Sequence, residues 1–169
     1  MKVKLLLADK NEIFCEGLEK LLEHEPDIEV VCTCRTGLEA IERANEHQPD
    51  VILIDTELPE CSGIETMQRI HERLPNTNII VLTHSEAEAD LISAVKAGAR
   101  AYISKDVSLE DLIKVIALVA KHEVVVSPPM ASRLLAEIGF LEDCEGPAEA
   151  IFQFSSYLVD ASYFPFLHS

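Results

Sequence analysis

The alternation of short apolar runs with amphipathic segments is the feature that most limits the folds open to this chain. Runs typical of β-strands lie at residues 3–8, 28–32, 51–54, 78–82 and 101–103. Each is followed by apolar residues at helical spacing, at residues 12–24, 36–47, 63–74, 86–97 and 108–122. Connections of this length allow consecutive strands to be parallel. The sequence therefore predicts an α/β fold with a doubly wound, five-stranded parallel sheet in the flavodoxin-like order.

The third apolar run is the clearest of the predicted strands. Val51–Ile54 is a continuous apolar stretch, opened by Pro49-Asp50 and ended by Asp55. A run without polar residues indicates a strand that is buried on both faces. In an open parallel sheet, ligands bind beyond the carboxyl ends of the strands. Asp55 therefore stands where this class of fold has its reactive groups.

Polar side chains also end three other predicted strands. Asp9 follows the first, Thr83 ends the fourth and Lys105 follows the fifth. Together with Asp55 they suit phosphoryl transfer, because a carboxylate can act as nucleophile and form an acyl phosphate. The Thr83 hydroxyl and the Lys105 ammonium would hold phosphoryl oxygens. Asp9 and Asp55 would help to bind Mg²⁺. Each residue alone has an ordinary explanation as a turn, cap or surface residue, so the prediction rests on their joint placement.

Four separated motifs carry a resemblance to a known family. LLLAD, VILID-x3-P-x3-G, IIVLT and AGARAYISKD occur in this order within residues 1–122. They resemble the motifs of the receiver domain of bacterial two-component response regulators. EVVVSPPMASRLL, at residues 123–135, is similar to the segment that follows the receiver in the NarL/FixJ (LuxR-type) subgroup.

The resemblance implies a role for each residue that matches a family motif. Asp55 would be the phosphoacceptor, Thr83 the switch hydroxyl and Lys105 the phosphate-binding lysine. Tyr102 would be the aromatic residue that moves with the state of the switch, although an aromatic packed on the sheet edge is the alternative. The backbone carbonyl of Glu57 would be a third ligand of Mg²⁺. The family also implies a histidine kinase as phosphodonor, an output face on the fourth helix, fifth strand and fifth helix, and a signalling module that is not an enzyme beyond its own phosphorylation and dephosphorylation.

Lys10 is a departure from the family pattern. Receivers usually carry two adjacent acidic residues after the first strand, whereas this chain has Asp9-Lys10. A cation at this position opposes a divalent metal ion. Lys10 could instead pair with Asp55 and partly replace the metal. We therefore expect weak Mg²⁺ binding and weak phosphorylation. Alternatively Lys10 points to solvent, and Asp9 with Asp55 suffices.

The residues after the receiver are a second departure. Members of the subgroup usually continue into a DNA-binding helix-turn-helix. Residues 136–169 are too few for a linker and such a domain, and they contain no Lys or Arg, which contacts to DNA phosphates require. We expect a receiver at 1–122, a linker segment with a helix at 123–138, and an apolar tail without a DNA-binding domain at 139–169.

The predicted tail is rich in aromatic residues and should be buried against something. Residues 148–159 could form one apolar helix. The tail could pack on its own receiver, on a second subunit or on a partner, and we prefer self-association as a homodimer. A sequence artefact or a truncated gene is the alternative.

Composition indicates which binding partners and which cellular compartment this chain is suited to. The formal net charge of −16 disfavours nonspecific contact with nucleic acid. No apolar run approaches the roughly 20 residues of a membrane span, and MKVKLLLAD is too short for a signal peptide. We therefore expect a cytoplasmic protein without membrane contact. The scattered cysteines have no zinc-ligand spacing and indicate buried thiols, with Cys32 and Cys34 on one face of a strand.

Two other functions remain open from the sequence. The chain could be a phosphorylation-independent pseudo-receiver, in which Lys10 and the tail hold one state of a dimerisation or interaction domain. A haloacid-dehalogenase-type phosphatase also uses an Asp nucleophile, but it has a second Asp two residues later, where this chain has Glu57.

Overall fold

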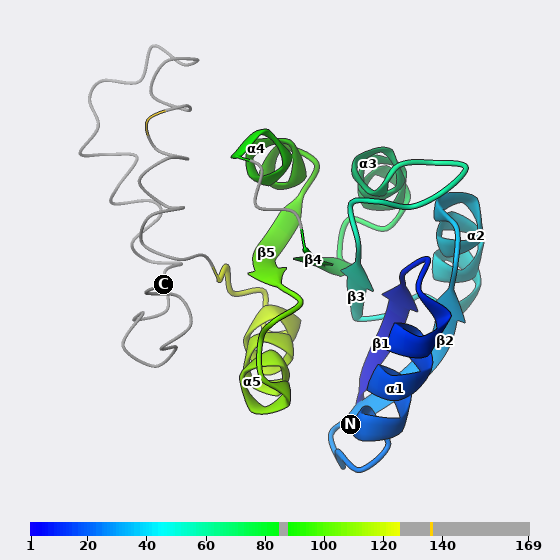
Figure 1. The fold of residues 1–169 in the computed structure, drawn as a ribbon, viewed down its shortest axis with the longest axis vertical. Coiled ribbons are helices and arrows are strands. Elements are labelled where there is room, and N and C mark those ends of the chain that lie inside the picture. The colour runs from blue at the N-terminus through cyan, green and yellow to red at the C-terminus, as the bar shows by residue number, and fades with distance from the viewer. Residues whose placement is uncertain (85–87, 126–135, 137–169) are drawn as a thin grey trace.

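The computed structural model describes residues 1–84, 88–125 and 136. The strands are β1 (Val3–Ala8), β2 (Ile28–Cys34), β3 (Val51–Ile54), β4 (Asn78–Thr83) and β5 (Ala99–Ser104). The helices are α1 (Glu12–Leu22), α2 (Gly37–His47), α3 (Gly63–Arg73), α4 (Glu88–Lys96) and α5 (Leu109–Ala120). All neighbouring strands pair in parallel, in the order β2-β1-β3-β4-β5 (Figure 1). This is the predicted doubly wound, flavodoxin-like receiver fold.

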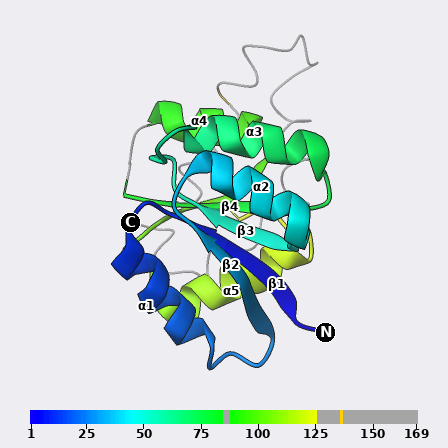
Figure 2. The same ribbon diagram turned by 90° about the vertical axis from the view of Figure 1, so that its right-hand side faces the viewer.

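The sheet separates two layers of helices. Helices α2, α3 and α4 lie on one face of the sheet, and α1 and α5 lie on the other (Figure 2). The four residues of β3 alternate between the two layers: Ile52 and Ile54 pack in the core beneath α2, α3 and α4, whereas Val51 and Leu53 pack in the core beneath α1 and α5. All four are buried, which confirms that the continuous apolar run is a strand covered on both faces.

Side-chain caps fix the first turns of the helices. The Asn11 side chain accepts a hydrogen bond from the Phe14 N–H at 3.1 Å, and Thr36 accepts from the Glu39 N–H at 3.1 Å. Ser108 accepts from the Asp111 N–H at 3.2 Å at the start of α5. Each bond satisfies a backbone donor that has no partner within its helix.

Some boundaries differ from the predicted ones by a few residues. Helix α5 ends at Ala120, because His122 adopts a left-handed backbone conformation with φ of 66°. Strand β2 continues to Cys34, since its pairing with β1 extends to Ala8. Strand β5 is longer than predicted for the same reason, because its pairing with β4 begins at Ala99. The chain then returns to β5, where Val125 forms a parallel bridge with Ala101.

The predicted linker segment and helix at 123–138, apart from residues 123–125 and 136, and the predicted tail at 139–169 lie outside the described residues. Within the described part of the chain, none of the helices has the length and apolar character that a membrane crossing requires.

Candidate functional site

The polar strand ends predicted from the sequence meet in one pocket. The pocket has a volume of about 140 Å³ and lies beyond the carboxyl ends of β1, β3, β4 and β5. Its lining contains all four predicted residues together with neighbours from the adjoining loops: Asp9, Lys10, Asn11, Phe14, Asp55, Glu57, Thr83, His84 and Lys105. The parallel sheet thus brings together side chains that are far apart in the sequence.

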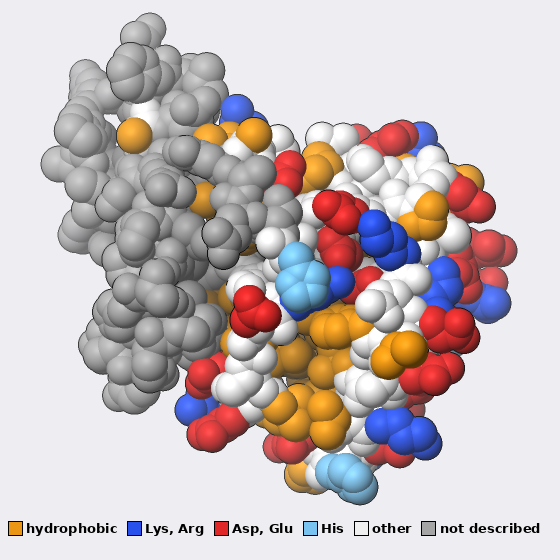
Figure 3. Space-filling view, viewed as in Figure 1, with side chains coloured by type: hydrophobic (Ala, Val, Ile, Leu, Met, Phe, Trp, Pro, Cys, Tyr) orange, Lys and Arg blue, Asp and Glu red, His pale blue; other side chains and the backbone are white. Residues whose placement is uncertain are grey.

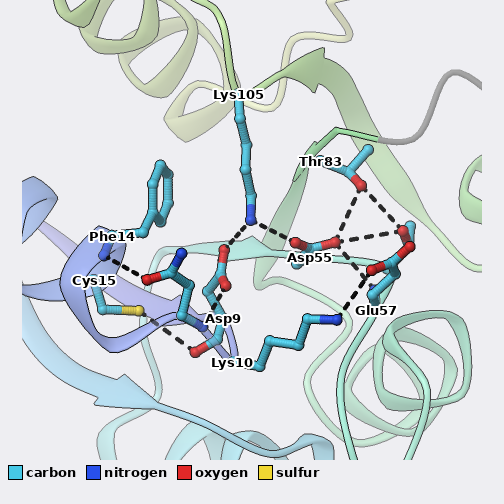
Figure 4. Close-up of polar contacts among 10 residues, drawn as sticks. Asp9, Lys10, Phe14, Cys15, Asp55, Glu57, Thr83 and Lys105 are labelled. Atoms are coloured by element: carbon cyan, nitrogen blue, oxygen red, sulfur yellow. Dashed lines mark hydrogen bonds and ion pairs between the residues drawn. The ribbon is translucent and has the colours of Figure 1, made fainter.

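Lys105 lies between the two carboxylates. Its ammonium group is 2.6 Å from Oδ2 of Asp55 and also contacts Oδ2 of Asp9 (Figure 4). The Phe14 ring covers the ammonium group, whose nitrogen is 4.7 Å from the ring centroid. Burial by itself would lower the pKa of Lys105, but the hydrogen bonds to Asp55 and Asp9 raise it above its ordinary value. Lys105 is therefore a fixed positive charge in the pocket.

The second oxygen of Asp55 is held by hydrogen-bond donors. Oδ1 accepts from the Glu57 backbone N–H at 3.0 Å and from the Thr83 hydroxyl at 3.1 Å. Burial alone would raise the pKa of Asp55, but the hydrogen bonds from Lys105 and the Glu57 N–H lower it below the usual range. Asp55 is therefore an ionised carboxylate, which is the form that a nucleophile needs.

Gly63 allows the loop after β3 to close against Asp55. Its N–H donates to the carbonyl oxygen of Thr56 at 3.0 Å. A Cβ atom at residue 63 would overlap the carbonyl oxygen of Asp55 and the Cα atom of Thr56, so only glycine fits here without a backbone shift. The close approach of the backbone explains why the motif VILID-x3-P-x3-G has a glycine, Gly63, at its last position.

The sequence analysis did not place Asn11, Phe14 and His84 in the lining of the pocket, nor Thr56 beside Thr83. The Thr56 hydroxyl lies 3.2 Å from the Thr83 hydroxyl, so both hydroxyls form one chain that ends on Asp55. A hydroxyl directly after the phosphoacceptor position was a usable signal for Thr56. No sequence signal indicated that the Phe14 ring covers Lys105, because this contact depends on how α1 is placed against the pocket.

Asp9 is fixed by its own loop. Its Oδ1 accepts from the Asn11 backbone N–H at 2.8 Å, and its backbone N–H donates to the carbonyl of Cys34 at 3.0 Å. The first bond is a local turn of the kind that Asp favours. The second ties the residue to the edge strand β2. Asp9 therefore presents its Oδ2 to Lys105 from a rigid backbone position.

Lys10 forms an ion pair with Glu57, whereas Asp55 pairs with Lys105. Its Nζ lies 3.1 Å from Oε2 of Glu57, with side-chain exposures of 56% and 68%. Figure 4 shows this ion pair on the side of the pocket opposite Lys105. The suggested pairing of Lys10 with Asp55 is wrong, because the buried Lys105 already occupies Oδ2 of that carboxylate.

Tyr102 lies on β5 with its side chain buried in the core beneath α2, α3 and α4. Its backbone pairs with Val81 on β4, two residues before Thr83. The inward position is compatible both with an aromatic packed at the edge of the sheet and with one position of a switch.

The chemistry of the donor set fits a magnesium ion that keeps most of its water ligands. Asp9 and Asp55 supply two carboxylates, and Mg²⁺ is commonly held by only one or two in phosphate-binding sites. Among the described residues, no group of three or more His, Cys, Asp or Glu is placed to hold a metal. A stronger all-protein site would need the acidic side chain that Lys10 replaces.

The comparison with protein families shows the family to which this chain belongs. The response regulator receiver domain family matches residues 5–117. The chain belongs to this family. It is therefore a receiver domain of two-component signalling systems, and membership sets aside the phosphatase alternative.

Curated relatives that this chain resembles include a transcriptional regulatory protein and a nitrate/nitrite response regulator. The receiver is 39% identical to the uncharacterised transcriptional regulatory protein YhcZ of Bacillus subtilis over 112 residues, which cover 66% of this chain and 52% of YhcZ. It is 34% identical to the nitrate/nitrite response regulator NarL of Escherichia coli over 134 residues, which cover 79% of this chain and 62% of NarL. The receiver thus spans between half and two thirds of the length of these relatives.

Among solved structures, a LuxR-family response regulator from Aurantimonas superposes with a TM-score of 0.73 at 27% identity, covering 81% of this chain and 98% of that one. The receiver domain of NarL from Mycobacterium tuberculosis superposes with a TM-score of 0.68 at 25% identity, covering 71% and 97%. Both comparisons confirm the predicted fold and its likeness to the NarL and LuxR type.

Proposed function

We propose that this receiver accepts a phosphoryl group on Asp55 from a histidine kinase in the cytoplasm and signals through protein–protein contacts. The observation that carries the proposal is the placement of Lys105 and Thr83 on opposite oxygens of an ionised Asp55. A carboxylate held in this way has a cation and a hydroxyl beside it, ready to bind the oxygens of an incoming phosphoryl group.

The transfer would proceed by attack of an Asp55 oxygen on the phosphorus of a phosphohistidine. The new bond joins this oxygen to phosphorus, and the phosphorus–nitrogen bond breaks. Its electron pair returns to the imidazole, which takes up a proton. Lys105 would move from the two carboxylates to the charge that develops on the phosphoryl oxygens, and Thr83 would turn its hydroxyl toward them.

Magnesium would be held by Asp9, Asp55 and the backbone carbonyl of Glu57, and it would supply further neutralisation of phosphoryl charge. We propose that this site is weak. Lys10 lines the pocket and brings a second ammonium group to it. Its charge is partly offset by Glu57, whose carboxylate is thereby kept from a metal ion.

The surroundings of the pocket suit a kinase contact. Ile13 on the first turn of α1 is 83% exposed, two residues after Asn11 in the pocket lining. Apolar side chains also reach the surface between α1 and α5 (Figure 3). We propose that a histidine kinase docks on this face. We further propose that α4, β5 and α5 form the output face and that the chain forms a homodimer. In this proposal the chain does not bind DNA.

The alternative is a phosphorylation-independent pseudo-receiver. It is favoured by one observation: Lys105 pairs with both Asp9 and Asp55, and Lys10 pairs with Glu57, so each of these carboxylates has a cationic partner without phosphate or metal. In this function, the protein would act as an interaction or dimerisation domain in one fixed state.

Labelling with a phosphodonor separates the two functions. The chain is incubated with acetyl phosphate over a series of Mg²⁺ concentrations, and its intact mass is measured. A gain of one phosphoryl group that is absent from Asp55→Asn supports the receiver, and a need for unusually high Mg²⁺ supports the weak site. No labelling at any Mg²⁺ concentration, also with cognate kinase, would establish the pseudo-receiver.

A further inference from the structure

A pair of thiols on β2 takes no part in the pocket. The Sγ atoms of Cys32 and Cys34 are 3.6 Å apart, so the two sulfurs are in direct contact. Residues separated by two positions on a strand point to the same face, as the sequence analysis expected. The contact is closer than strand geometry alone produces, since Cα atoms two residues apart on a strand are separated by about 6.6 Å and their side chains run side by side.

An irregularity in β2 accounts for this close approach. Leu5 of β1 pairs with Val30, but Leu6 pairs with Cys32, so Val31 is left over as a bulge directly before the first cysteine. A bulge bends a strand and increases its local twist, which changes the angle between neighbouring side chains. Among the described strands, β2 lies at one edge of the sheet and pairs only with β1. A further small shift of its backbone would therefore disturb one ladder of hydrogen bonds and not two.

The two thiols differ in access. Cys32 is partly exposed, whereas Cys34 is fully buried. Burial raises the pKa of Cys34, and the neighbouring Cys32 raises it further. Arg43 on α2 is near enough to favour the charged form of Cys34 and to interact with a charge on Cys32. Cys32 is therefore the thiol that a reagent from solvent meets first, and Cys34 is placed behind it.

We propose that Cys32 and Cys34 form a modification site for peroxides, which convert the pair to an intramolecular disulfide. The Cys32 sulfur attacks one oxygen of the peroxide, the oxygen–oxygen bond breaks, and a sulfenic acid and one water form. The Cys34 sulfur then attacks the Cys32 sulfur, and the hydroxyl group leaves as a second water after taking the Cys34 proton. Two thiols and one hydrogen peroxide thus give one disulfide and two waters.

The disulfide would be strained and easily reduced. Closing the gap between the sulfurs to a bond forces the two side chains out of the parallel arrangement of a strand, and strained disulfides are the more reducible ones. The modification would therefore form under peroxide exposure and be reversed by ordinary dithiols. This places it among transient disulfides and not among structural ones.

Thiol counting with peptide mass analysis tests the proposal. Every sample carries Cys144→Ser, so that the cysteine outside the described residues does not contribute. The reduced protein is treated with hydrogen peroxide, its remaining thiols are alkylated, and it is digested with trypsin. Both cysteines fall in one peptide, residues 21–35, because no Lys or Arg separates them. The expected result is a loss of two thiols per chain and a 21–35 peptide lacking two hydrogens and alkyl groups, both reversed by dithiothreitol.

Matched variants identify the pair. Cys32→Ser and Cys34→Ala should each abolish the loss of two thiols, whereas Cys15→Ser and Cys61→Ser should leave it unchanged, because those thiols are buried without a described disulfide partner. Circular dichroism confirms that each variant is folded. Two intact thiols in the 21–35 peptide, oxidation of Cys32 to sulfinic acid in place of a disulfide, or a bond between two chains would each overturn the proposal.

Discussion

The Lys105 ammonium lies 2.6 Å from Oδ2 of Asp55, and both side chains are only 6% exposed. The same ammonium contacts Asp9, so one cation is shared by two buried carboxylates. A buried charge left without a partner is strongly destabilising, so this arrangement holds the pocket together in the unphosphorylated protein as well as preparing it for phosphate.

Lys105→Met should destabilise the protein by about 3 kcal/mol, because it leaves two buried carboxylates without their counter-ion. The same substitution should also lower the extent of Asp55 phosphorylation. Urea unfolding measures the first effect and acetyl phosphate labelling the second. Lys114→Met is the matched control, since Lys114 forms an exposed helix pair with Glu110 and should leave both properties nearly unchanged. Equal stability of the two variants would contradict the central role of Lys105.

Stability should decrease at both ends of the pH scale. The pKa of Asp55 is lowered below 3.8 in the folded state, so its contribution is present above that value and is lost as the pH falls through the folded pKa. The pKa of Lys105 is raised above 10.5, so its contribution is present below that value and is lost as the pH rises through the folded pKa. Unfolding free energies of the wild type and Asp55→Asn, measured in urea across pH, check this. The variant should show the weaker acid dependence, and identical curves would exclude the assignment to Asp55.

Lys10→Asp should strengthen Mg²⁺ binding by about tenfold or more, because it exchanges a repelling cation for a carboxylate beside the pocket. Isothermal titration calorimetry gives the affinity directly. Lys20→Asp makes the same change of charge in the last turn of α1, where it should have little effect on the metal. Unchanged Mg²⁺ affinity in Lys10→Asp would show that Asp9 and Asp55 suffice.

Thr83→Ala should slow phosphorylation of Asp55 by on the order of tenfold, because it removes the hydroxyl that donates to Oδ1. Thr83→Ser retains the hydroxyl and should remain close to the wild type. Labelling time courses with acetyl phosphate compare the three proteins. If Thr83→Ser is as slow as Thr83→Ala, the methyl group and not the hydroxyl is responsible.

Gly98→Ala should destabilise the protein by about 1–3 kcal/mol. Its backbone has a φ of 104°, and an added Cβ would lie 3.0 Å from the His71 ring on α3. Gly17→Ala is a matched control within α1, where nothing lies within 4 Å and a gain of about 0.5–1 kcal/mol is expected. Thermal unfolding distinguishes the two. Adding His71→Ala to Gly98→Ala should recover the part due to the ring, and no recovery would assign the whole effect to the backbone.

Much of the fold could be predicted because each element has a local signal. The β3 run has no polar residue, and Asn11, Thr36 and Ser108, which are residue types that favour helix N-caps, cap α1, α2 and α5. The convergence of Asp9, Asp55, Thr83 and Lys105 follows from parallel strands alone, since their carboxyl ends share one edge of the sheet. The ends of these strands can be predicted because each apolar run ends at or next to one of these polar residues.

The partners of individual side chains could not be predicted in the same way. Lys10 was expected on Asp55 but contacts Glu57, because the choice depends on the path of two loops and on which oxygen Lys105 has already taken. The contact of the Thr56 hydroxyl with Thr83 and the position of the Phe14 ring over Lys105 could not be predicted either. Such contacts are decided by rotamers and by the placement of helices against the sheet, which sequence periodicity does not contain.

The return of the chain to the sheet after α5 determines how later residues are attached. Val125 donates its N–H to the carbonyl of Arg100 at 2.8 Å and bridges to Ala101, the residue before Tyr102. The Arg100 side chain in turn donates to the carbonyl of His122, so the exit is anchored on both sides of the turn. The last residue before the break in the described chain, Val125, is therefore anchored to β5, which lies at an edge of the described sheet.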